Sequence, residues 1–140
     1  MSINSFLKRG ILVKQACSKE EIEDLLKIVE RDLHDSKISE VSYDWQFGIA
    51  YNAALKLATI LVRSAGYRIK GQGHHMNTIA LISEFLGKDK KEYSDYLDTC
   101  RRKRNTVEYD CVGGATEQDV KELQDFVLEL QKHVQEYLDE

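Results

Sequence analysis

The stretch from Tyr43 to Gly66 constrains the fold more than any other part of the chain. It reads YDWQFGIAYNAALKLATILVRSAG, and a helix would gather its few polar residues into one narrow stripe: Asn52, Lys56, Thr59 and Arg63. A helix that is apolar on nearly every other side must be surrounded by other elements. We therefore expect a central helix about 36 Å long whose apolar residues, from Trp45 to Val62, are enclosed.

The same stretch does not predict a membrane span. Lys56 and Arg63 interrupt the apolar run, and a span needs about 18 uninterrupted apolar residues. The chain also starts with only a short apolar stretch that Lys8 and Arg9 break, which is not the pattern of a signal peptide. We expect a soluble protein in the cytoplasm that has no membrane partner.

The composition is that of a globular protein with long helices. The chain of 140 residues has no proline, which favours helices over a turn-rich β fold, and its length is enough for one hydrophobic core. We expect residues 1–140 to form a single domain. The net charge of −4 argues against a surface that coats nucleic acid generally, so a polyanion site has to be a local patch.

The three cysteines predict neither disulfides nor a zinc site. Cys17, Cys100 and Cys111 form no C-x-x-C pair and are odd in number, which indicates thiols in a reducing compartment. The adjacent His74 and His75 open a helix after a glycine-containing loop, where their side chains would point about 100° apart. A structural or capping role is expected for them, with no metal site and no cofactor, because metal sites need several convergent ligands.

Capping signals and helical spacing place the elements before and after the central helix. Ser18 and Glu21 match the S-x-x-E capping box and predict a helix over about 19–35. Thr116 is expected to cap a last helix that is apolar on one face and acidic on the other. Residues 3–15 are expected to form a short amphipathic helix.

The region between the central and last helices is expected to hold a loop and two helices. Residues 67–73 contain two glycines and no helical period, which indicates the loop. A short helix over about 76–86 should end at Gly87, and a long helix should follow over about 89–109. The fold class predicted from all these elements is all-α, an antiparallel (up-and-down) helical bundle of four main helices plus short extra helices.

The long helix over about 89–109 carries a positive charge on its apolar stripe. The apolar stripe consists of Tyr93, Leu97, Cys100, Val107 and Cys111. Their helical spacing places one more member between Cys100 and Val107, and that position is occupied by Arg104. A guanidinium in that place is costly unless it is paired or lies at a cleft or a subunit boundary. Two interpretations stay open. Arg104 pairs inside the protein, or it joins Arg101, Arg102 and Lys103 in an anion site, where the arginine fork suits phosphate.

Three segments together resemble a known family. They are the stretch from Tyr43 to Gly66, the segment GQGHHMNTIALISEFLG and the helix ending in RRKRNTVEYD, and they resemble the HEPN (higher eukaryotes and prokaryotes nucleotide-binding) domains over roughly Tyr43 to Asp110. The resemblance implies a helical bundle that is commonly a homodimer and often works with a nucleotidyltransferase-fold partner. Many such domains are metal-independent endoribonucleases of toxin–antitoxin, abortive-infection and CRISPR-linked systems.

The family signature is only partly present. It reads R-x(4–6)-H near the end of the long helix, and Arg104 and Asn105 match its R-N start. The histidine position falls on Tyr109, or on Asp110 or Cys111 at the wider spacings. A tyrosine with the ordinary pKa near 10 is a poor base at neutral pH. The resemblance therefore implies a HEPN-like domain that binds without cleaving.

Three functional hypotheses follow from the sequence. The first is a homodimeric module that binds RNA, a nucleotide or a nucleotidyltransferase-fold partner through Arg101, Arg102, Lys103 and Arg104. The second is an active, metal-independent endoribonuclease toxin that uses Arg104 and Asn105, with Tyr109 in place of the histidine. The third is a helical adaptor without a nucleic-acid ligand, whose acidic last helix docks other proteins.

Overall fold

A computed structural model describes residues 2–71, 73–106 and 113–140. These residues form a mostly helical protein with one small two-stranded sheet, which fits the predicted all-α class. The elements follow in the order α1 (Ile3–Lys8), β1 (Leu12–Lys14), α2 (Lys19–Asp35), α3 (Tyr43–Ser64), β2 (Tyr67–Ile69), α4 (His74–Ala80), α5 (Ile82–Leu86), the 3₁₀ turn η1 (Lys88–Lys90), α6 (Lys91–Asn105) and α7 (Glu117–Asp139).

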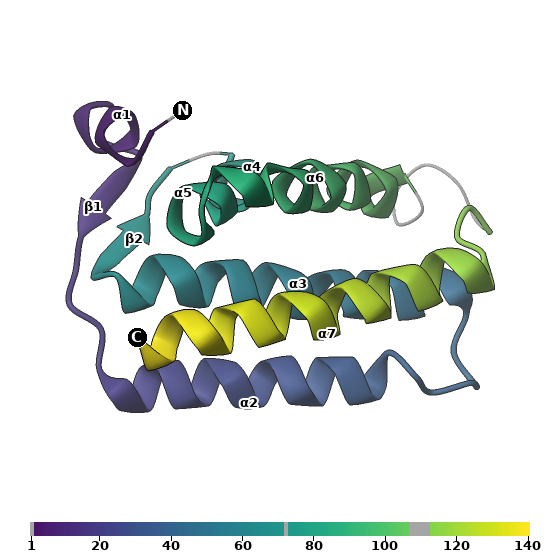
Figure 1. The fold of residues 1–140 in the computed structure, drawn as a ribbon. Coiled ribbons are helices and arrows are strands. Elements are labelled where there is room, and N and C mark those ends of the chain that lie inside the picture. The colour runs from purple at the N-terminus through teal and green to yellow at the C-terminus, as the bar shows by residue number, and fades with distance from the viewer. Residues whose placement is uncertain (1, 72, 107–112) are drawn as a thin grey trace.

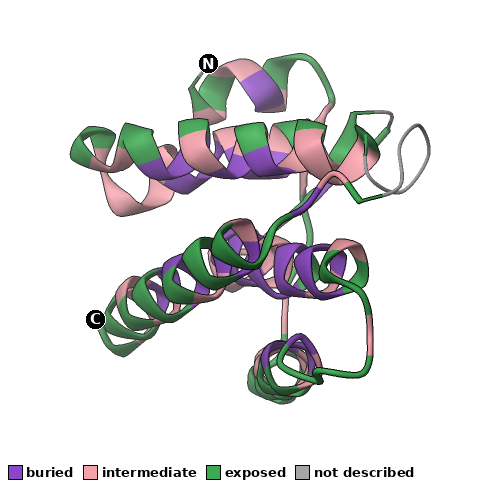
Figure 2. Cartoon of the chain, turned by 90° about the vertical axis from the view of Figure 1, so that its right-hand side faces the viewer, coloured by how far each residue is buried: buried purple, intermediate pink, exposed green. Residues whose placement is uncertain are grey.

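The long helices lie in layers with α3 in the middle (Figure 1). Helix α3 packs against α2 and α7, and on its other side against α4, α5 and α6. Helix α7 is exposed along its outer face and buried along the face toward its neighbours (Figure 2). Among the described residues, no helix combines the length and the apolar character that crossing a membrane requires.

The central helix forms as the sequence predicts. Ser42 caps it by accepting a hydrogen bond from the Trp45 amide, and Ala65 and Gly66 follow its last turn. Its apolar residues from Phe47 to Val62 are mostly buried, but Trp45 is 63% exposed, so the expectation that Trp45 is enclosed is wrong. Trp45 lies seven residues before Asn52, and this spacing puts it on the polar stripe of the helix, not on a buried face.

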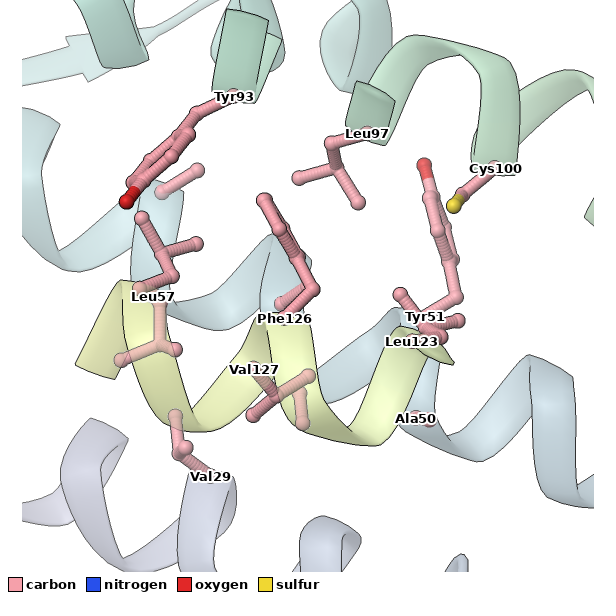
Figure 3. Packing of buried hydrophobic residues seen from close by; sticks show 14 of the residues in the cluster. Val29, Ala50, Tyr51, Leu57, Tyr93, Leu97, Cys100, Leu123, Phe126 and Val127 are labelled. Carbon is pink, nitrogen blue, oxygen red and sulfur yellow. The ribbon is translucent and has the colours of Figure 1, made fainter. Parts of the chain in front are cut away.

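The main core fills the space between these helices (Figure 3). Side chains from α2, α3, α6 and α7 form one cluster, which includes Val29, Leu57, Leu97, Phe126 and Val127. The ring of Tyr93 packs edge-on against Phe126, with centroids 5.6 Å apart. These contacts confirm the predicted apolar stripe of α6 as far as Cys100, which is 4% exposed.

The two segments that form the small sheet differ from the sequence prediction. Helix α1 covers only Ile3–Lys8, and Gly10 then takes a positive φ of 72°. The next residues form β1, which pairs antiparallel with β2, so that Leu12 faces Ile69. The expected helix over 3–15 and the expected loop over 67–73 are thus wrong where the strands lie. Pairing between segments so far apart in the chain leaves no local period in either one.

The other predicted elements are close to those observed. Helix α2 spans 19–35 as expected, and Thr116 caps α7 in a full capping box with Asp119. The helix expected over 76–86 is divided at Leu81 into α4 and α5. Ser18 accepts the hydrogen bond from the Glu21 amide, but the Glu21 carboxylate binds Arg63, so only half of the predicted capping box forms.

Arg63 joins the end of α3 to three other segments. Its guanidinium lies 2.8 Å from the Glu21 carboxylate on α2 and donates to the carbonyl oxygens of Gln15, Ala16 and Tyr67 at 2.8–3.2 Å. Its side chain is only 11% exposed. One guanidinium thus binds carbonyl groups in the connection between β1 and α2 and at the start of β2, together with a carboxylate in the first turn of α2.

We expect Arg63→Ala to lower the free energy of unfolding by about 2 kcal/mol, because it removes several hydrogen bonds to a charged group. Chemical denaturation followed by circular dichroism measures this. Arg68→Ala is the matched control, since Arg68 is exposed on β2 and should change stability by less than about 0.5 kcal/mol. Equal losses in the two variants would contradict the role assigned to Arg63.

Candidate phosphate-binding pocket

A pocket of about 300 Å³ lies between the start of α4 and the end of α6. Two charged or polar residues of α6, Arg101 and Asn105, line one side. The other side consists of Gly73, His74, His75 and Met76. This volume is at the lower end of the range for small-molecule sites. The pocket brings together two helices that the sequence analysis treated separately.

The start of α4 is held in place by His74. Gly73 adopts the left-handed conformation, with a φ of 74°, and turns the chain into the helix. The His74 ring donates from Nε2 to the Ile69 carbonyl oxygen of β2 at 2.9 Å, and its own carbonyl accepts from the Thr78 hydroxyl at 2.7 Å. His74 therefore has a structural role, as expected from the sequence.

His75 has a different environment, because its ring contacts the protein core. Nδ1 lies 3.2 Å from the hydroxyl oxygen of Tyr51, a fully buried residue in the middle of α3. No described residue pairs with Nε2 of this ring. Burial lowers the pKa of His75, and the positive charge of Arg104 lowers it further. The His75 imidazole is therefore uncharged at neutral pH.

Tyr51 is one of the core residues in Figure 3, and its hydroxyl contacts His75, which lines the pocket. Burial raises the pKa of its hydroxyl to about 12, although the charge of Arg104 acts in the opposite direction. The guanidinium carbon of Arg104 lies 5.7 Å from the centroid of the Tyr51 ring, within the range of a cation–π contact. The Tyr51 hydroxyl stays protonated at neutral pH and can donate or accept a hydrogen bond.

Arg101 and Asn105 are held by neighbours on α6. Nε of Arg101 donates to the Asp98 carboxylate at 2.9 Å, which fixes a guanidinium that is 21% exposed. The Asn105 side-chain oxygen lies 3.4 Å from Nη1 of Arg104. Because the Asp98 bond uses only Nε, the terminal nitrogens of Arg101 remain available to an anion in the pocket.

The predicted site residues do not form a single patch. Arg101 lines the pocket, whereas Arg104 is half-buried against the Tyr51 ring. Arg102 is 67% exposed beside Asp98, and Nζ of Lys103 forms an ion pair with Asp119 of α7 at 3.1 Å. Among the residues that the structure describes, Arg102 and Lys103 therefore do not reach this pocket. Tyr109, the expected replacement for the family histidine, lies outside the described residues, as do Asp110 and Cys111.

His75 is the pocket residue whose possible role in binding the sequence analysis did not recognise. Tyr51 and His75 are 24 residues apart, and Arg101 is a further 26 residues along the chain, so no local motif connects the three. The adjacent histidines after Gly73 were the sequence feature that could have pointed to a role for His75. In the described ranges, no group of three His, Cys, Asp or Glu side chains is placed to hold a metal ion.

The arrangement can bind a phosphate group. It combines an arginine guanidinium, an asparagine amide and an uncharged imidazole, all of which can donate hydrogen bonds to phosphate oxygens. Comparison with known proteins adds no further guide, because no protein-family model, curated protein or solved structure matches this chain. The functional argument therefore rests on the pocket itself.

We expect Tyr51→Phe to lower the free energy of unfolding by about 1 kcal/mol, because it leaves Nδ1 of His75 without its partner while keeping the buried ring. Thermal and chemical denaturation measure the change. Tyr43→Phe is the matched control, because Tyr43 is 45% exposed, and the same deletion of a hydroxyl there should have little effect. Wild-type stability in Tyr51→Phe would show that the bond to His75 contributes nothing.

Proposed function

We propose that the protein is a HEPN-like RNA-binding module that holds a backbone phosphodiester in the pocket between α4 and α6. The observation that supports this most directly is the convergence of Arg101, Asn105 and His75 on one pocket. A guanidinium suits two phosphate oxygens at once, and the amide and imidazole add further donors. These are side chains of the kind that contact nucleic-acid backbones.

The charge distribution supports a local anion site in an acidic protein. The net charge is −4, but positive charges from Lys56 on α3 and from Arg101 and Arg104 on α6 act on His75, which lines the pocket. Such a cluster raises the local concentration of a polyanion without attracting it to the rest of the surface. This pattern favours a binding site of limited size over extended coating of nucleic acid.

The family resemblance supplies the remaining parts of the proposal. Arg104 and Asn105 match the start of the HEPN signature; Asn105 lines the pocket, and Arg104 packs on Tyr51. The family would also imply an antiparallel bundle for the four long helices, a homodimer in the cytoplasm and a nucleotidyltransferase-fold partner in a toxin–antitoxin or defence system. The layered packing around α3 supports the bundle, and the other properties follow from the resemblance alone.

We expect the wild-type protein to bind a short oligoribonucleotide with an affinity that falls as salt rises, because cation–phosphate contacts release counterions. Arg101→Gln should weaken binding at least tenfold and lower the salt slope by about one unit. Fluorescence anisotropy at several salt concentrations measures both. Lys27→Gln is the control, as it removes a positive charge from the exposed face of α2 and should leave binding unchanged. Absence of binding at low salt would rule out the proposed function.

A second candidate function is cleavage of the bound RNA, and the position of His75 favours it. His75 provides the uncharged imidazole that the partial signature lacks. It would take the proton of the 2′-hydroxyl while that oxygen attacks phosphorus. The bond to the 5′-oxygen would break, and water would protonate the leaving oxygen, giving a 2′,3′-cyclic phosphate and a 5′-hydroxyl. Arg101, which lines the pocket, would stabilise the negative charge that develops on the phosphate, and the positive charge of Arg104 beside Tyr51 would add to the local field.

If the protein cleaves RNA, His75→Gln should lower the cleavage rate by about a hundredfold or more, because a positioned base contributes 10²–10⁴-fold. Gel analysis and detection of the cyclic phosphate measure this. His34→Gln, a change on the exposed face of α2, should keep full activity. Intact RNA after long incubation with concentrated wild-type protein would eliminate cleavage while leaving the binding proposal in place.

A further inference from the structure

The bond between Tyr51 and His75 fixes which ring nitrogen faces a ligand. Tyr51 is packed in the main core, so its hydroxyl is a rigid anchor at 3.2 Å from Nδ1. Because Nδ1 is used in this way, Nε2 is the nitrogen left for a molecule in the pocket that His75 lines. The ring is thus already held in an orientation suited to contact with a bound group. Binding therefore loses little side-chain entropy at His75.

We propose, on the basis of the phosphodiester-binding function above, that His75 contacts the bound phosphate through Nε2 and that binding is coupled to uptake of a proton by the His75 ring. Tyr51 is the positioning residue for this contact. The Tyr51 hydroxyl is compatible with both charge states of the ring, because it can donate to an unprotonated Nδ1 and accept from a protonated one. A proton can therefore be gained without loss of the Tyr51 bond.

The charges around His75 give the proposed coupling its direction. The groups that act on the ring are mostly positive and come from its own helix, from α3 and from α6: His74, Lys56, Arg101 and Arg104. On α6 the Asp98 carboxylate is already paired with Arg101, and the Tyr51 hydroxyl is uncharged. In the free protein a further positive charge on His75 is therefore unfavourable.

A bound phosphodiester reverses this balance. Its negative charge lies among the same positive groups and favours the protonated ring, so the pKa of His75 is higher in the complex than in the free protein. Binding then takes up protons, and affinity increases as the pH falls through the interval between the two pKa values. One titrating group limits the change to a factor of ten per pH unit.

The experiment uses the full chain and a 2′-O-methyl oligouridylate with an internal fluorophore and hydroxyl groups at both ends. This probe cannot be cleaved through its 2′-position, and its phosphodiesters do not titrate between pH 5.5 and 8. Fluorescence anisotropy at constant ionic strength gives the dissociation constant at each pH. Calorimetry in buffers of different ionisation enthalpy gives the number of protons taken up. We expect the dissociation constant to fall several-fold from pH 8 to pH 5.5, with uptake of up to one proton.

Four variants assign the effect to the ring. His75→Gln keeps a side-chain amide but cannot titrate, so binding should remain measurable and lose its pH dependence. His34→Gln and His133→Gln each remove a histidine that does not line the pocket, and both should keep it. Tyr51→Phe should keep binding but weaken it, because the ring is no longer held.

The outcomes separate the two proposals. Binding that is independent of pH, or a pH dependence that persists unchanged in His75→Gln, would overturn the coupling and leave the phosphodiester-binding function standing. Absence of binding at every pH would overturn both. If His75→Gln fails to fold, as judged by circular dichroism, NMR titration of His75 in the wild-type protein with and without the oligonucleotide decides the question. An unchanged pKa would then overturn the coupling.

Discussion

The structure depends on the enclosure of α3. This helix of 22 residues is buried on the faces toward α2, toward α7 and toward the α4–α6 layer, and it leaves little more than one polar stripe outside. Burying so much apolar surface from one element is a large favourable term, and α2, α4, α5, α6 and α7 all pack against this helix. Arg63 then closes the end of α3 by binding the segments that enter and leave the sheet.

The same helix connects the core to the pocket. Tyr51 is at once a core residue and the partner of His75, so the position of the imidazole is determined by the packing of α3 against α4 and α6. Arg104 lies over the same ring and raises the cost of a second positive charge nearby. Tyr51 does not line the pocket, yet it determines how the His75 ring is held there. A change in core packing at Tyr51 would therefore alter the lining of the pocket through His75.

Helix α6 divides its basic residues among different tasks. Successive residues point about 100° apart, so Arg101, Arg102, Lys103 and Arg104 cannot share one face. Arg101 reaches the pocket, Arg102 is exposed to solvent, Lys103 ties α6 to α7, and Arg104 packs on Tyr51. A basic run that resembles one patch in the sequence thus contributes a single residue to the lining of the site. The other charges stabilise helix packing or shape the local field.

The sequence by itself determined the elements whose signals are local. Periodic apolar residues and capping side chains within a few positions of one another predicted α2, α3 and α7, and the stripe on α6 predicted its buried face. Pairing of β1 with β2, the binding of Arg63 to the carbonyl groups of Gln15 and Ala16 and the meeting of His75 with Tyr51 were decided only by the tertiary structure. These contacts join residues more than twenty positions apart, or satisfy polar groups that no local pattern marks. Packing around α3 brings these distant residues together. The reason is that all faces of this helix favour burial, whatever the position in the sequence of the elements that cover them.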